Sequence, residues 1–128
     1  MKSVILMGVL ASGVAACPAV WADACTQLPA SLQNASVSHI SQAAELQKLD
    51  EQLDAPMQPC FQPVNADNRK NVCANGRVLA EQVLKVVSRI DEAGKKNAFL
   101  SNAKMKSYKT GVALLDHMKK LAADKICL

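Results

Sequence analysis

The clearest alternation of apolar and polar residues along the chain runs from Asp67 to Gly94. Apolar residues and one glycine recur there at spacings of three and four, and charged residues occupy the opposite side, which predicts an amphipathic helix. We expect Asn65 or Asp67 to cap its start and Gly94 to end it in the left-handed conformation. The inner stripe is Val72, Gly76, Leu79, Val83, Val86 and Ile90, and the outer side is Arg77, Glu81, Lys85 and Glu92. Gly76 within this stripe suggests that another backbone approaches closely.

A second periodic stretch begins at Ser101 or Asn102 and continues to the C-terminus. Its spacing predicts another amphipathic helix, in which Asp116 pairs with Lys120 one turn later. The expected inner stripe is Met105, Tyr108, Val112, Leu115, Met118, Ala122 and Ile126, and the expected outer side is Lys106, Lys109, Asp116, His117, Lys120 and Asp124.

Residues 37–54 lack Gly and Pro and are rich in helix formers, which predicts a helix from about Val37 to Asp54. Its apolar residues do not form one stripe, so it either contacts different neighbours along its length or starts later. Pro56, Pro59 and Pro63 then favour an extended, stiff connection. Residues 25–36 predict an irregular lead-in with room for one helical turn.

These stretches predict an all-α fold: a small bundle of three main helices plus an N-terminal lead-in segment. Aromatic residues are scarce, at 3% of the chain, whereas β-rich domains favour aromatic and β-branched residues. Residues 94–101 form a connection short enough to make the last two helices antiparallel neighbours.

The N-terminus has the pattern of an export signal. Lys2 precedes an uncharged apolar run that is shorter than the roughly 20 residues of a membrane span. We expect cleavage after Ala22, with Ala24 as a second site, so that residues 1–22 are a signal peptide and 23–128 a single domain. The alternative is lipidation at Cys17, which follows a lipoprotein-like box and would make the protein membrane-anchored.

The mature chain retains four cysteines, and an even number in an exported protein predicts two disulfides. The four are Cys25, Cys60, Cys73 and Cys127. Helix topology gathers them at one end of the bundle if the lead-in runs back beside the first helix. We expect Cys60 to pair with Cys73 and Cys25 with Cys127, and the strongest competitor pairs Cys73 with Cys127.

Charge is unevenly distributed. Residues 23–93 hold six Lys or Arg and nine Asp or Glu, a net charge of −3, whereas residues 94–128 hold eight and two, a net charge of +6. A dipolar surface is the simpler interpretation. The alternative is a basic contact surface formed by Lys106, Lys109, Lys119 and Lys120. Nucleic acid is not expected as a partner, because the chain offers no aromatic platform.

The sequence contains no motif for a catalytic, metal or cofactor site. It has no Cys-x-x-Cys, phosphate-binding glycine loop or nucleophile elbow, and no cofactor or metal is expected. Asp116 and His117 are adjacent and therefore diverge on a helix, so His117 is expected on the solvated surface. His39 is expected at the surface or its boundary.

We therefore expect a non-catalytic protein-binding domain in the periplasm or outside the cell. It would serve an envelope or secretion apparatus, or act as an inhibitor or immunity protein, with a protein partner of unknown identity. The alternatives are a lipid-anchored envelope protein and, less favoured, a small secreted hydrolase.

Overall fold

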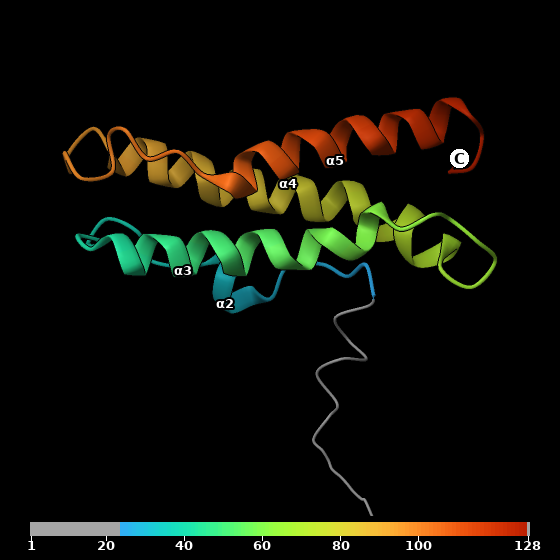
Figure 1. The fold of residues 1–128 in the computed structure, drawn as a ribbon, viewed down its shortest axis with the longest axis horizontal. Coiled ribbons are helices and arrows are strands. Elements are labelled where there is room, and N and C mark those ends of the chain that lie inside the picture. The colour runs from blue at the N-terminus through green and yellow to red at the C-terminus, as the bar shows by residue number, and fades with distance from the viewer. Residues whose placement is uncertain (1–23, 128) are drawn as a thin grey trace, which may run out of the picture.

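A computed structural model describes residues 24–127 (Figure 1). The predicted signal peptide and the alternative lipidation site Cys17 lie outside these residues. The fold is all-α, with three main helices and two disulfides. The elements in chain order are the short helix α2 (Ala30–Gln33), α3 (Ala43–Asp54), the 3₁₀ helix η2 (Ala55–Phe61), α4 (Arg69–Ala93) and α5 (Lys106–Ala123).

The longest helix, α4, confirms the predicted amphipathic pattern. Every residue of the predicted inner stripe, from Val72 to Ile90, is buried, and the four charged residues of the opposite side are exposed. α4 and α5 pack side by side as antiparallel neighbours, with α3 along the same core (Figure 1). The hydrophobic residues of these helices form one continuous core cluster.

Both ends of α4 differ in detail from the prediction. Neither Asn65 nor Asp67 caps the helix, because its N-cap residue is Asn68, which makes no side-chain cap hydrogen bond. The side-chain Oδ1 of Asn65 instead accepts hydrogen bonds from the backbone N–H groups of Asp67 and Asn68, at 2.8 and 3.0 Å, and so shapes the turn that leads into α4. Gly94 has φ −61°, which is right-handed, so the predicted left-handed ending was wrong. A Cβ on Gly94 would lie 3.0 Å from Ser101 Cα, so a larger residue there would require the backbone of the following connection to shift slightly.

Gly76 is also explained by packing, but against a side chain. A Cβ at Gly76 would lie 2.5 Å from the Sδ atom of Met118 in α5, so it is a side chain of α5 and not a backbone that occupies this space. Gly111 of α5 has the corresponding role for Leu84 of α4, whose Cδ2 would lie 3.0 Å from an added Cβ. Two glycines thus let large side chains of the facing helix sit close to the helix axes.

The helix α5 is rotated relative to the prediction. Its buried residues are Ser107, Gly111, Leu114, Met118 and Leu121. Of the predicted inner stripe only Met105 and Met118 are buried, Leu115 and Ile126 are half-buried, and Tyr108, Val112 and Ala122 are exposed. The helix also begins at Lys106, not at Ser101 or Asn102. The reason for the rotation is that the small residues Ser107 and Gly111 allow close contact with α3 and α4.

The first predicted helix starts later than Val37. Val37 and Ile40 are buried but precede α3, so they join the core from a turn and not from a helix. The side chain of Asn97 donates hydrogen bonds to the carbonyls of Ser38 and Ile40, at 3.2 and 2.8 Å, which holds this turn in place. This late start explains why the apolar residues of 37–54 formed no single stripe.

The proline segment is not the extended connection that we predicted. Residues Ala55–Phe61 continue from α3 as a 3₁₀ helix. Pro56 occupies its first turn, where a missing N–H costs little, and the buried residues Met57, Pro59 and Cys60 attach it to the core. Packing of these three side chains therefore offsets the hydrogen bonds that the prolines cannot make.

Residues 25–40, which we call the strap, are held by a row of polar side chains on α4. Asn75 Nδ2 donates to the Cys25 carbonyl at 3.0 Å, and Gln82 Oε1 accepts from the Leu28 N–H at 2.9 Å. Arg89 donates to the carbonyls of Gln33 and Ala35. Because these three α4 residues are seven apart, they lie on one side of the helix, about 10 Å from one to the next. The strap therefore runs along α4, and not only beside the first helix as predicted.

The disulfides join Cys25 to Cys60 and Cys73 to Cys127. The four cysteines form two pairs, as predicted, but the favoured pairing was wrong and the competing one, with Cys73 joined to Cys127, was right. The strap meets α4 at Asn75, and residues two apart on a helix point about 200° away from each other. Cys73 therefore faces the end of α5, where Cys127 lies. Cys25 pairs with the remaining cysteine, Cys60 of η2.

Candidate functional site

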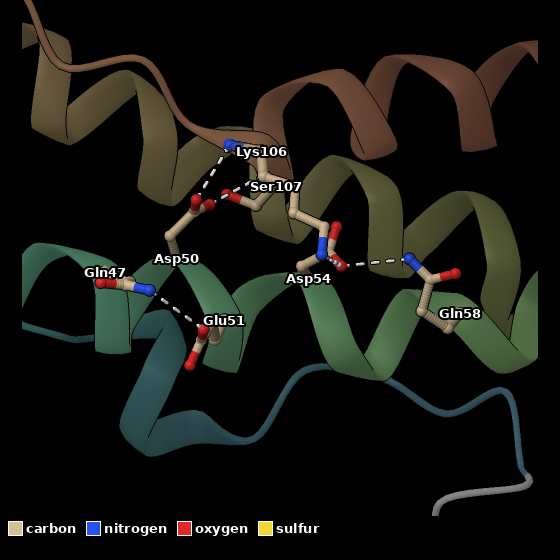
Figure 2. A network of polar contacts seen from close by, with 7 residues as sticks. All are labelled: Gln47, Asp50, Glu51, Asp54, Gln58, Lys106 and Ser107. Atoms are coloured by element: carbon tan, nitrogen blue, oxygen red, sulfur yellow. Dashed lines mark hydrogen bonds and ion pairs between the residues drawn. The ribbon is translucent and has the colours of Figure 1, made fainter.

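A network of polar contacts lies where α3 meets the start of α5 (Figure 2). Asp50 of α3 accepts hydrogen bonds from the backbone N–H groups of Lys106 and Ser107, at 2.9 and 2.8 Å. These are two of the free amides at a helix N-terminus, where a carboxylate also complements the helix dipole. α5 has no side-chain cap of its own, so Asp50 caps it from another helix.

Lys106 connects Asp50 to a second carboxylate. Its backbone binds Asp50, and its ammonium lies 3.6 Å from Oδ2 of Asp54, which also accepts a hydrogen bond from Gln58 at 3.1 Å (Figure 2). Asp54 is almost fully buried, whereas the side chain of Lys106 is largely exposed. The ammonium thus approaches from solvent and offsets the cost of burying a charge.

A serine, a lysine and a carboxylate in contact raise the question of nucleophilic chemistry. Ser107 is fully buried, however, and its Oγ has no hydrogen-bond partner within the described residues. No substrate could reach this hydroxyl without local unfolding, and Asp50 is already occupied by two backbone amides. The junction of α3 and α5 therefore has a structural role, which is to fix the start of α5.

His117 was predicted to lie on the solvated surface, and the structure shows otherwise. It is half-buried, and its ring lies 5.5 Å from that of Phe61 in η2. Its Nε2 is buried with no hydrogen-bond partner among the described residues. The side chain therefore helps to attach η2 to α5. His39 is exposed, as expected, with its Nδ1 3.3 Å from the hydroxyl of Ser36.

The four lysines of the predicted basic surface are all exposed, but they are used differently. Lys106 binds Asp54, and Lys120 lies 3.3 Å from Asp116, as the spacing predicted. Lys109 and Lys119 make no ion pair with any described residue. Of the four, only these last two carry a positive charge that is not paired with a described carboxylate.

The rotation of α5 places apolar side chains beside these two free lysines. Tyr108 and Val112 are 52% and 45% exposed, and both lie on the side of α5 that also carries Lys119, at spacings of four and seven. Lys109 lies next to Val112 along the helix surface. We refer to Tyr108, Lys109, Val112 and Lys119 as the outer face of α5. Sequence reasoning missed this face because it assigned Tyr108 and Val112 to the core.

A second exposed feature adjoins this outer face. Tyr108 and Lys109 border a shallow cavity of about 280 Å³ together with Asp91 of α4. Phe99, in the connection between α4 and α5, is also 41% exposed. Two aromatic residues of the C-terminal part of the chain, Phe99 and Tyr108, are therefore exposed to solvent.

Other kinds of site find no support in residues 24–127. No three His, Cys, Asp or Glu side chains converge there in a way that could hold a metal ion. Within the same range, none of the helices combines the length and the apolar character needed to cross a membrane. Comparison with known proteins found no matching family model, no similar curated protein and no similar solved structure.

Proposed function

We propose that this chain is an exported, non-catalytic domain that binds another protein through the outer face of α5. The observation that carries the proposal is the exposure of Tyr108 and Val112 beside Lys109 and Lys119. Tyrosine is enriched in protein interfaces, whereas lysine is found mainly at their rims. The outer face therefore has the composition of an apolar centre with a basic border.

The charges of this surface specify the partner's chemistry. Lys109 and Lys119 form no ion pair with a carboxylate of the described residues. Acidic residues at the rim of the partner's surface would therefore form ion pairs with them. A net charge of +6 over residues 94–128 would in addition speed association with such a surface at low salt. An acidic protein is thus the partner that we propose, whether in an envelope or secretion apparatus or as the target of an inhibitor or immunity protein.

Export is supported by the N-terminal pattern and by the two disulfides, which persist in oxidising compartments. The intact mass of the protein recovered from the producing cell tests this part. A mass beginning at Asp23, or at Cys25 for the second cleavage site, is expected. A lipid on Cys17 would instead identify a membrane-anchored protein, and a retained Met1 would contradict export.

Site-specific photocrosslinking tests the binding surface. A photoreactive residue at Tyr108 or Val112 should crosslink to one defined protein in the native compartment, and the same residue at Lys85, on the exposed side of α4, should not. The purified pair should then lose affinity at least tenfold on Val112→Asp, and more weakly on Lys119→Gln. Equal crosslinking from Lys85, or an affinity that Val112→Asp leaves unchanged, would refute the proposed surface.

A further inference from the structure

The two disulfides differ in how far solvent can reach them. In the disulfide of Cys25 and Cys60 the two residues are 2% and 0% exposed, and we call it the buried disulfide. In the disulfide of Cys73 and Cys127, which we call the accessible disulfide, Cys127 is 9% exposed and Cys73 is half-buried. A cavity of about 350 Å³ is lined by both of these residues. Thiol–disulfide exchange requires a thiolate to reach a sulfur atom, so access favours exchange at the accessible disulfide.

The charges beside the two disulfides differ in a way that has the same effect. Arg69 and Lys70 line the cavity at the accessible disulfide, and none of the described residues that line it is acidic. The cavity beside the buried disulfide is lined by Asp67, with no lysine or arginine among its described residues. The turn that follows α5 carries one charge of each sign, Asp124 and Lys125, and so leaves this contrast unchanged. An attacking thiolate is an anion, so local charge attracts it to the accessible disulfide and repels it from the buried one.

The accessible disulfide fastens the turn after α5 to the start of α4. In this turn, residues 124–127, Lys125 has φ 61°, the left-handed conformation that favours glycine. The backbone N–H of Ile126 donates to the Leu121 carbonyl at 2.9 Å, and Nε of Arg69 donates to the Ile126 carbonyl at 2.9 Å. These two hydrogen bonds and the disulfide hold a conformation that a lysine disfavours. Breaking the disulfide removes the covalent contact between the turn and α4, so reduction favours release of the turn.

We propose that the accessible disulfide is a reducible latch, which a dithiol opens while the buried disulfide stays intact. Opening releases residues 124–127 from α4. The bundle stays folded, because side chains that are fully buried, such as Leu79 and Leu114, come from the helices and not from this turn. The latch joins the start of α4 to the end of α5, and it does not depend on the function proposed for the outer face of α5.

The exchange with a dithiol proceeds in two steps. One thiolate of the reductant attacks Sγ of Cys73, the more exposed cysteine, and the S–S bond breaks. Cys127 leaves as a thiolate, whose negative charge Arg69 and Lys70 stabilise. The second thiolate of the reductant then attacks the reductant's own sulfur in the mixed disulfide, Cys73 leaves as a thiolate, and the reductant becomes a disulfide. Two electrons thus pass from the dithiol to the protein, and the two protons of the dithiol reach the cysteines through solvent.

Timed reduction with dithiothreitol tests the order in which the disulfides open, on purified protein with both disulfides formed. After quenching with N-ethylmaleimide, peptide mapping should show the cysteines of the accessible disulfide alkylated about ten times faster, or more, than those of the buried one. Lys70→Gln should slow reduction of the accessible disulfide about two-fold, and Lys85→Gln, an exposed lysine elsewhere on α4, should not. Equal rates for the two disulfides, or equal effects of the two substitutions, would overturn the proposal.

Amide hydrogen exchange tests the release of the turn. The double variant Cys73→Ser with Cys127→Ser reproduces the open latch without a reductant. In it the amide of Ile126 should exchange about tenfold faster or more, while that of Leu114 stays protected. Adding Lys125→Gly should restore part of the protection of Ile126, since glycine adopts the left-handed conformation freely, and Lys125→Ala should not. Full protection of Ile126 in the double variant, loss of protection at Leu114, or equal effects of glycine and alanine would contradict the latch.

Discussion

The carboxylate of Asp50 lies 2.8 Å from the backbone nitrogen of Ser107, a residue that follows it by 57 positions. Through this contact α3 supplies the N-terminal cap that α5 lacks in its own sequence. The side of α5 that is buried follows instead from Ser107 and Gly111, whose small size allows close packing, and it leaves Tyr108 and Val112 exposed.

Removing this cap should destabilise the fold. Asp50→Ala leaves two amides at the start of α5 without an acceptor, and we expect a loss of about 1–2 kcal/mol in the free energy of unfolding. Urea denaturation followed by circular dichroism measures it. Glu51→Ala, the neighbouring exposed acid, should change stability by no more than about 0.5 kcal/mol. Equal losses in the two variants would contradict capping by Asp50.

The rotation of α5 can be tested by comparing substitutions at a buried and an exposed position of the helix. Leu114→Ala removes a fully buried side chain and should cost about 2–5 kcal/mol. Val112→Ala removes a side chain that is 45% exposed and should change stability by about 0.5 kcal/mol or less. The reverse order, measured by the same denaturation experiment, would restore the stripe that the sequence pattern suggested.

The disulfide pairing predicts which thiol each single substitution frees. Cys25→Ala should leave Cys60 as the free thiol, and Cys73→Ala should leave Cys127. Peptide mapping after alkylation without reduction identifies them. Removing both members of either pair should cost about 2–4 kcal/mol, and the two losses should be similar because their loops are of comparable length. A free Cys127 in Cys25→Ala would show that the predicted pairing is the real one.

Gly94 should tolerate a methyl group less well than Gly76. An alanine Cβ at Gly94 would meet backbone atoms of Leu100 and Ser101 at 3.0–3.1 Å, and backbone cannot easily move away. We expect Gly94→Ala to cost about 1–3 kcal/mol. At Gly76 the obstacle is the flexible side chain of Met118, and alanine gains about 1 kcal/mol of helix propensity, so the net loss should be smaller. A larger loss for Gly76→Ala would contradict this explanation.

One ion pair gives a prediction for pH dependence. Lys95 donates a hydrogen bond to Glu92, and together with its positive charge this lowers the pKa of the Glu92 carboxyl. Because the folded pKa is lower than the unfolded one, the pair stabilises the fold above the unfolded pKa, and this contribution is lost as the pH falls through the folded pKa. Both side chains are exposed, so the effect on stability is small.

Carboxyl ¹³C titration of Glu92 measures this pKa directly. Lys95→Gln should raise it toward the ordinary value for glutamate. Lys96→Gln should raise it less, since Lys96 acts only through its charge and contributes least to the shift. An unchanged pKa in Lys95→Gln would contradict the pairing.

The local pattern of apolar residues was sufficient to predict the buried side of α4, but it was insufficient to predict that of α5. α4 has one apolar stripe with charges opposite, so a single orientation satisfied the periodicity. α5 has two stripes offset by one residue, and the buried one contains Ser107 and Gly111, which made it look the less apolar of the two. The choice between them depends on contacts with other helices, such as that of Leu84 of α4 beside Gly111. No local pattern contains that information.

The candidate sites show the same limit. The four cysteines could be predicted to pair, but the choice of partners depends on which side of α4 the strap follows. Polar residues at positions 75, 82 and 89 form a visible row on the flank of α4. Their partners are backbone groups, which have no signature in the sequence, so the row gave no indication of what it binds.

The row of Asn75, Gln82 and Arg89 has a consequence for how this protein can vary. Because it binds backbone groups, most exposed side chains of residues 25–40 are free to change, and only the buried ones are constrained by packing. The number of residues between the attachment points is constrained instead, since α4 places its three side chains at fixed intervals. A deletion of one residue within the strap would misalign every later attachment. Substitutions should thus be common in this segment, and insertions and deletions rare.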